Sequence, residues 1–228
     1  MDKYEVLTKN ECNKLSSAIL DAIRNHEEEP PAGTQVIKDL IIKNPKVGRL
    51  DLKKTVITNK GMAILTAALR TNKTINAIDL SRNQLTKESM GPFAAAIQLK
   101  QVILKYSLNL NNLGDEGVKL LSAGLKEIKR LKDVQLHVVG MGDEGAKALA
   151  EALVGKVFLA RLDVSNNSIG VEGAKALGQS LKGIASIEHF NISNNAIKDE
   201  GTVALSEGLT GANGLKCLLM IGLSLIHI

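Results

Sequence analysis

Apolar and polar residues follow one pattern of 28 residues along most of this chain. Each copy opens with apolar residues at positions 1, 4 and 6 and has another at position 11, and four of the six complete copies have Asn at position 9. Gly stands at position 15 except in the second copy, where Ser89 takes its place, and apolar residues return at 19 and 23. A period of this length is typical of solenoids built from stacked units. Six copies run without interruption and a seventh, starting at Leu215, is cut off; the six begin at Val47, Ile75, Ile103, Leu131, Leu159 and Ile187.

The spacing of the apolar residues changes within each copy. Positions 4 and 6 alternate as in a strand with one buried face. Later apolar residues lie three and four apart, as on one face of a helix, for example Ala146, Leu149, Ala150 and Leu153. Each copy therefore predicts a short strand, a turn and a helix. One such unit cannot bury its apolar face alone, but stacked units build a continuous core.

This pattern, L-x-x-L-x-L-x-x-N-x-L-x-x-x-G-x-x-x-L-x-x-x-L, resembles the leucine-rich repeat in its ribonuclease-inhibitor-like subtype, over residues 47–225. The resemblance implies an α/β solenoid, a curved arc of about six 28-residue repeats with a helical N-terminal cap. Its strands would line a concave parallel sheet and its helices the convex side. Repeats of this subtype generally bind proteins, although the fold does not identify the partner.

The asparagine at position 9 stands where the chain turns away from the strand. We expect it to hydrogen-bond the backbone of adjacent turns, contributing about 1 kcal/mol per residue. Thr55 could replace it in part in the first copy, and Val139 cannot in the fourth, which we expect to be the weakest. The other copies carry Asn83, Asn111, Asn167 and Asn195.

An Asp-Glu-Gly sequence precedes three of the predicted helices. Its aspartates, Asp115, Asp143 and Asp199, are predicted to cap the N-termini of the helices that follow them. The glutamates beside them would interact favourably with the helix dipole. Metal ligation is the alternative, but one carboxylate per turn of the solenoid favours capping.

The residues before the first copy read as a cap, assigned to 1–46. Residues 8–26 predict an amphipathic helix that begins with a capping box at Thr8–Glu11. Residues 27–34 read as a Pro-Gly linker, and 35–43 as the helix of a degenerate half repeat. A separate binding helix is the alternative. The apolar stripe of the first helix comprises Cys12, Leu15, Ile19, Ala22 and Ile23.

After the six repeats at 47–214, residues 215–228 form the truncated seventh repeat. Leu215, Leu218, Met220 and Leu225 keep the strand spacing, but Leu223 replaces the Asn. An uncovered apolar strand edge invites pairing with another chain. We interpret the final SLIHI as a non-native tail; contact with another chain and a hydrophobic anchor are the alternatives.

Composition restricts the function. Aromatic residues make up 2% with no Trp, which disfavours base-stacking RNA binders. Two distant cysteines, Cys12 and Cys217, exclude a disulfide framework or a zinc site from this chain alone. No apolar stretch reaches about 18 residues, so no membrane span is expected. The polar N-terminus does not match the pattern of a signal peptide, so none is expected. We therefore expect a cytoplasmic protein, with cytoskeletal association as one option.

Sequence motifs for catalysis are scarce. The patterns of phosphate-binding loops, zinc proteases, serine hydrolases and dinucleotide-binding folds do not occur. The four histidines are scattered, and His137 and His189 fall at different strand positions. We therefore predict no catalytic residue, no cofactor, no metal site and no small-molecule substrate, and the chain is not expected to be an enzyme.

What remains is a surface. Outward strand positions are predicted to point into the concave face, where charges of both signs alternate. Such a surface suits a folded protein partner better than a polyanion, although an ordinary solvated sheet face would look similar. The candidate protein-binding residues are Arg49, Asp51, Lys53, Asp79, Arg82, Lys105, Asn109, Asp133, Gln135, His137, Arg161, Asp163, His189 and Asn191.

We thus predict a non-catalytic protein–protein interaction scaffold, in a cytoskeletal, flagellar or signalling assembly. One alternative is a GTPase-activating regulator similar to the Ran type; Arg82 is its only candidate arginine, and the acidic tail of that family has no counterpart here. The other is nucleic-acid binding, driven by the net charge of +5. A basic cluster of Lys126, Lys129, Arg130 and Lys132 could contact phosphate or an acidic partner.

Overall fold

A computed structural model describes residues 9–45, 48–98, 103–210 and 212–222, with side chains from residue 13 onward. The predicted capping box at Thr8–Glu11, the side chain of Cys12 and the tail from Leu223 lie outside these residues. Strands and helices alternate after two N-terminal helices. The order is α1 (Lys9–Asn25), α2 (Pro30–Lys43), β1 (Arg49–Asp51), α3 (Asn59–Leu69), β2 (Ala77–Asp79), α4 (Lys87–Gln98), β3 (Lys105–Ser107), α5 (Gly114–Lys126), β4 (Asp133–Gln135), α6 (Asp143–Leu153), β5 (Arg161–Asp163), α7 (Val171–Leu181), β6 (His189–Asn191), α8 (Lys198–Gly208) and β7 (Cys217–Leu219).

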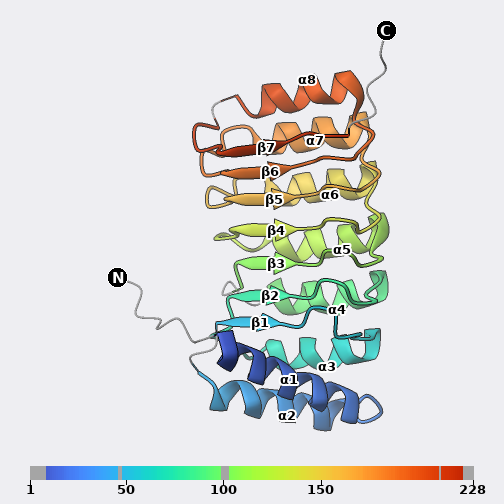
Figure 1. Cartoon of the computed structure of the whole chain (residues 1–228), viewed down its shortest axis with the longest axis vertical. Coiled ribbons are helices and arrows are strands. Elements are labelled where there is room, and N and C mark those ends of the chain that lie inside the picture. Colours follow the sequence, from blue (N-terminus) through green and yellow to red (C-terminus); the bar gives the residue numbers. More distant parts are fainter. Residues whose placement is uncertain (1–8, 46–47, 99–102, 211, 223–228) are drawn as a thin grey trace.

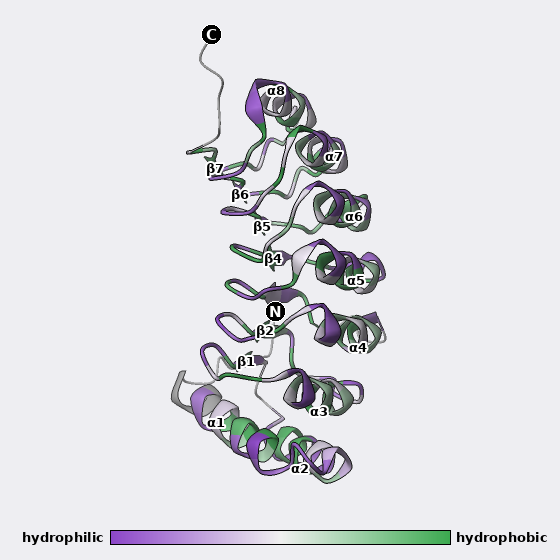
Figure 2. Cartoon of the chain, turned by 90° about the vertical axis from the view of Figure 1, so that its right-hand side faces the viewer, coloured by the Kyte–Doolittle hydropathy of each residue, from purple (hydrophilic) through white to green (hydrophobic). Residues whose placement is uncertain are grey.

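The strands form one open parallel sheet in chain order, β1 to β7 (Figure 1). Each strand pairs with the next at an offset of 28 residues, for example Leu50 with Ile78 and Ile78 with Tyr106. The helices form a second layer against one face of the sheet (Figure 2). The structure is therefore the predicted α/β solenoid, a curved arc with its strands on the concave side.

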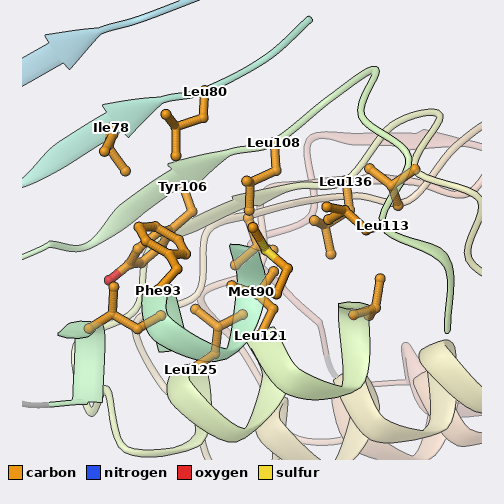
Figure 3. Close-up of a cluster of buried hydrophobic side chains, with 14 of the residues drawn as sticks. Ile78, Leu80, Met90, Phe93, Tyr106, Leu108, Leu113, Leu121, Leu125 and Leu136 are labelled. Carbon is orange, nitrogen blue, oxygen red and sulfur yellow. The ribbon is translucent and has the colours of Figure 1, made fainter. Parts of the chain in front are cut away.

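The core lies between the sheet and the helix layer. The middle residue of each strand from β1 to β6 is buried, while its neighbours are partly exposed. Figure 3 shows Tyr106 of β3 and Leu108, which follows this strand, on the side of the sheet that faces Met90 and Phe93 of α4. Tyr106 packs edge-on against Phe93, with ring centroids 6.2 Å apart, and its hydroxyl donates to the carbonyl of Ile103 at 2.9 Å. Burial in this apolar layer raises the pKa of Tyr106.

The predicted asparagine ladder is confirmed. Asn83 Oδ1 accepts the backbone N–H groups of Thr55 and Ile57 at 3.2 and 3.0 Å. Its Nδ2 donates to the carbonyls of Leu52 and Leu80 at 2.9 and 2.8 Å. One side chain therefore links two consecutive turns of the solenoid.

In the fourth copy, a backbone carbonyl takes over part of the role of the missing asparagine. Val139 is fully buried, and its carbonyl accepts the N–H groups of Leu113 and Gly114 at 3.1 and 2.9 Å. An asparagine there would accept the N–H groups of Asn111 and Leu113, as Asn167 accepts those of Val139 and Met141 one repeat later. The Val139 carbonyl therefore satisfies one of these two donors, and the weakness expected of this copy stays a prediction.

The prediction that each Asp caps its own helix is wrong. Helix α6 begins at Asp143, so the N-cap is the preceding residue, Gly142, and not Asp143. Instead, the carboxylate of Asp115 accepts the N–H groups of Gly142 and Gly145, at 2.6 and 2.8 Å, one repeat later. Asp143 makes the same pair of bonds to the start of α7, at Gly170 and Gly173. These two aspartates therefore cap the N-terminus of the helix in the next repeat and not that of their own helix.

The prediction of a linker at 27–34 is also wrong, because α2 already begins at Pro30. Proline lacks an N–H group and fits the first turn of a helix, where that donor would have no partner. Gly33 is buried, and a Cβ there would lie 2.8 Å from Cβ of His26. Helix α1 packs beside β1, where Ser16 Oγ accepts the N–H of Asp51 at 3.1 Å. The proposed division at 46 and 214 stays a prediction.

At the other end, β7 continues the sheet and leaves apolar side chains uncovered among the described residues. Leu218, Leu219 and Ile221 are 41%, 39% and 69% exposed. The strand spacing expected for Leu218 is confirmed by its pairing with Phe190.

Candidate functional site

The strand register gathers most of the predicted binding residues on one face. Position 3 of the repeat forms a row across the sheet, and position 5 forms a second row beside it. Both point away from the buried middle residue, so they face the concave side. We call these two rows the concave strip: Arg49, Ala77, Lys105, Asp133, Arg161 and His189 in the first row, and Asp51, Asp79, Ser107, Gln135, Asp163 and Asn191 in the second.

The part of the strip over β1 to β5 carries charges that pair across strands. Arg49 lies 3.9 Å from Asp51 and 3.7 Å from Asp79, and Arg161 lies 3.5 Å from Asp133. Burial raises the pKa of Asp133, against the opposing effects of a hydrogen bond from Gln135 and the charge of Arg161. The carboxylates of Asp79 and Asp133 are thus mostly buried, while the guanidinium groups that pair with them are exposed to solvent.

Beside the strip, residues mainly of the turns that follow β3 to β7 line a shallow hollow of about 370 Å³ with mostly uncharged polar walls, to which the strip contributes Asp163 and Asn191. His137 Nδ1 lies 2.9 Å from Ser165 Oγ, which in turn donates to Asp163 at 2.6 Å. The amide of Asn191 also donates to Asp163, at 3.3 Å. These contacts fix the orientation of the polar groups before any partner arrives.

The order of His137, Ser165 and Asp163 differs from that of a catalytic triad. In a triad the histidine lies between the serine and the carboxylate and removes the serine proton. Here the serine lies in the middle and gives its own hydrogen bond to Asp163. Ser165 is also buried at 2% exposure, so the group serves to position its neighbours.

Asn166 and Asn194 line the hollow and were missed among the candidate residues. Both occupy position 8, where the backbone takes a positive φ in every described copy, as it does at Lys54 and Arg82. The Ser-Asn-Asn sequence that recurs there was the available signal, since asparagine tolerates this conformation well. Their amides are linked, Asn194 donating to Asn166 at 3.1 Å.

The remaining predicted residues lie beside the strip. Lys53 and Arg82 are exposed in the turns after β1 and β2, and Asn109 accepts the N–H of His137 at 2.8 Å in the turn after β3. Within the described residues, no three His, Cys, Asp or Glu side chains are grouped so that they could hold a metal ion. No helix in the described ranges combines the length and the apolar character needed to cross a bilayer.

The predicted basic cluster lies where helices run into strands. Lys126 ends α5, and Lys129, Arg130 and Lys132 follow in the connection to β4. In the next connection Lys156 is buried at 5% exposure, and its Nζ donates to the carbonyl of Lys126 at 2.6 Å. A lysine is thus packed between two turns of the solenoid.

This buried lysine should make stability depend on pH. Burial lowers the pKa of Lys156 below its ordinary 10.5, although Glu127 opposes the effect. Between the lowered and the ordinary pKa the unfolded chain binds more protons, so stability rises with pH in that window. We expect the unfolding free energy of the wild type to rise relative to Lys156→Met as pH increases toward about 10. Urea unfolding across pH measures this, with the exposed Lys119→Met as control; a constant difference would contradict it.

Comparison with known proteins agrees with the geometry. A family model described as "Leucine Rich repeat" matches residues 107–122, 157–178 and 184–206. These segments fall on the repeats derived above. The chain is a leucine-rich repeat protein. No curated protein matches this leucine-rich repeat protein in sequence.

Solved structures similar to this chain are distant from it in sequence. The structure titled "Leiomodin-1 Actin-Binding Site 2" has a TM-score of 0.53 and 15% identity, covering 81% of this chain and 90% of its own. An internalin from Listeria monocytogenes has a TM-score of 0.49 and 13% identity, covering 83% of this chain and 52% of its own. At these identities the leiomodin likeness concerns the fold alone, and the ribonuclease-inhibitor-like subtype stays a prediction.

Proposed function

We propose that this leucine-rich repeat protein is a non-catalytic scaffold that binds a protein partner through the concave strip. The observation that carries the proposal is the register, which places cations, carboxylates and amides of successive strands side by side on one face. Cross-strand pairs and ladder bonds hold these groups in place. Preordered side chains lose little entropy when a partner binds.

The partner belongs to an intracellular cytoskeletal, flagellar or signalling assembly. The strip carries both signs of charge, so a folded protein with a matching mixed surface complements it better than a uniform polyanion. Electrostatic complementarity of this kind gives specificity and speeds association. Because the leiomodin-1 structure is named for an actin-binding site, the cytoskeletal class is the first to test.

The exposed cations of the strip offer the cleanest test. Asp79 and Asp133 have side chains only 15% and 13% exposed, so reversing their charge would disturb the sheet. Changing Arg49, Lys105 and Arg161 together to Gln removes three charges without placing a new anion beside those carboxylates.

Affinity capture from the native source should identify proteins bound by the wild type, and purified candidates should then be titrated. We expect the triple strip variant to bind at least about tenfold more weakly, which corresponds to about 1.4 kcal/mol. The matched control changes Lys119, Lys147 and Lys175 on α5, α6 and α7 to Gln and should bind as the wild type does. Equal affinity of both triple variants, with unchanged melting, would refute the role of the strip.

A further inference from the structure

Three exposed apolar residues lie in the connection between α6 and β5. Val154, Val157 and Phe158 are 66%, 60% and 47% exposed. The chain's other two phenylalanines, Phe93 and Phe190, are buried to within 1%. The connection also buries Lys156 at a position where the copies before and after it bury isoleucine (Ile128 and Ile184). The usual arrangement, apolar inside and charged outside, is thus inverted at this point.

The preceding repeat places cations beside this apolar row. Positions 24, 27 and 28 hold Val154, Val157 and Phe158 in the fourth copy, and Lys126, Lys129 and Arg130 in the third. Copies stack in register at an offset of 28 residues, so each apolar side chain has a basic counterpart on the adjacent turn. The guanidinium of Arg130 lies 5.8 Å from the ring centroid of Phe158, which confirms the contact.

These cations are available to a partner. The ion pairs formed within the described residues involve Arg49, Lys60, Lys147, Arg161, Lys175 and Lys216, and none of the three. All three side chains belong to exposed residues. We call the six residues Lys126, Lys129, Arg130, Val154, Val157 and Phe158 the edge patch.

We propose that the edge patch is a second docking surface, separate from the concave strip, for an acidic segment of a protein partner that also carries apolar side chains. Its apolar residues would cover Val157 and Phe158, and its carboxylates would meet Lys129 and Arg130. Aromatic and arginine side chains dominate the energy of protein interfaces. Stacking on Phe158 holds the Arg130 guanidinium in place before binding, which lowers the entropy cost.

A membrane with anionic lipids has similar chemistry but fits less well. Docking on a bilayer buries apolar side chains to a depth of about 5–10 Å. Phe158 is already more than half covered, partly by Arg130, so it offers a contact surface rather than a side chain free to insert.

A phage-displayed library of short random peptides, selected on the full chain, tests the proposal. We expect enrichment of peptides that combine Asp or Glu with Leu, Ile or Phe. In fluorescence anisotropy, an enriched peptide should lose at least about tenfold in affinity with Arg130→Glu and with Phe158→Asp. Matched controls are Lys119→Glu on α5 and Val203→Asp, a 57% exposed residue of α8, which should bind as the wild type does.

Three results would overturn the proposal. One is the absence of enrichment, and another is enrichment of peptides that bind both patch variants as tightly as the wild type. The third is binding to phosphatidylserine vesicles that Phe158→Asp abolishes while no peptide is enriched, which would assign the patch to lipid. Melting curves of each variant verify folding, and Val157→Asp replaces any variant that fails to fold. The triple strip variant should keep its peptide binding, so the two surfaces are tested independently.

Discussion

Gly145→Val is expected to destabilise the solenoid by about 2–4 kcal/mol, by combining overpacking with the loss of a helix cap. A Cβ at Gly145 would lie 2.7 Å from Oδ1 of Asp115 and 2.9 Å from Cγ of Met141. The same Asp115 oxygen accepts the N–H groups of Gly142 and Gly145. The added side chain must therefore displace the carboxylate that joins two successive helices.

Two further variants separate the causes. Lys147→Ala, two residues along the same helix, should change stability by no more than about 0.5 kcal/mol. Asp115→Ala removes the cap without adding bulk and should cost about 1–2 kcal/mol, less than the valine. Urea unfolding followed by circular dichroism gives all three values. Equal losses for Gly145→Val and Lys147→Ala would show that position 15 has been assigned the wrong role.

The period and the hydrogen-bonding chemistry of single side chains made much of this fold predictable. A strict 28-residue spacing fixes the strand register, because equivalent residues must stack to bury a common core. The side of the sheet on which Asp51 or Arg161 lies follows from alternation along a strand. Asn83 could be predicted to bond the backbone because a buried amide must satisfy both its donor and its acceptor.

The direction of the aspartate caps could not be obtained in this way. Asp115 and Asp143 occupy the same position in consecutive copies, so the sequence alone does not say whether each caps its own helix or the helix of the next copy. Which helix each carboxylate reaches depends on how closely the turns approach in space. The linker predicted around Pro30 and Pro31 was wrong for a related reason. Prolines are common in linkers, but they also fit the first turn of a helix.

The face on which the candidate residues lie was predictable from the sequence, but the contacts between them were not. The period placed His137 and Asp163 on the concave face, but the link through Ser165 depends on the turn that follows the strand. Val157 and Phe158 show the same limit for the edge patch. They directly follow Lys156, whose burial depends on a bond to a carbonyl 30 residues earlier in the chain.

Asn83→Ala should cost about 3–4 kcal/mol, from several buried backbone groups left without partners at about 1–3 kcal/mol each. The residue is 8% exposed and serves Thr55, Ile57, Leu52 and Leu80 through its two polar atoms. Because stacked repeats are stabilised largely by their nearest neighbours, the loss acts on the interface between the first and second copies.

Gln84→Ala is the matched control, since this adjacent side chain is exposed and should contribute no more than about 0.5 kcal/mol. Hydrogen exchange should show faster exchange at the N–H groups of Thr55 and Ile57 in Asn83→Ala, with little change at α6. A loss no larger than that of Gln84→Ala would mean that water replaces the amide at no cost. The stacking of the first two copies would then depend on the pairing of β1 with β2 and on apolar contacts such as those of Leu52 and Leu80, both fully buried.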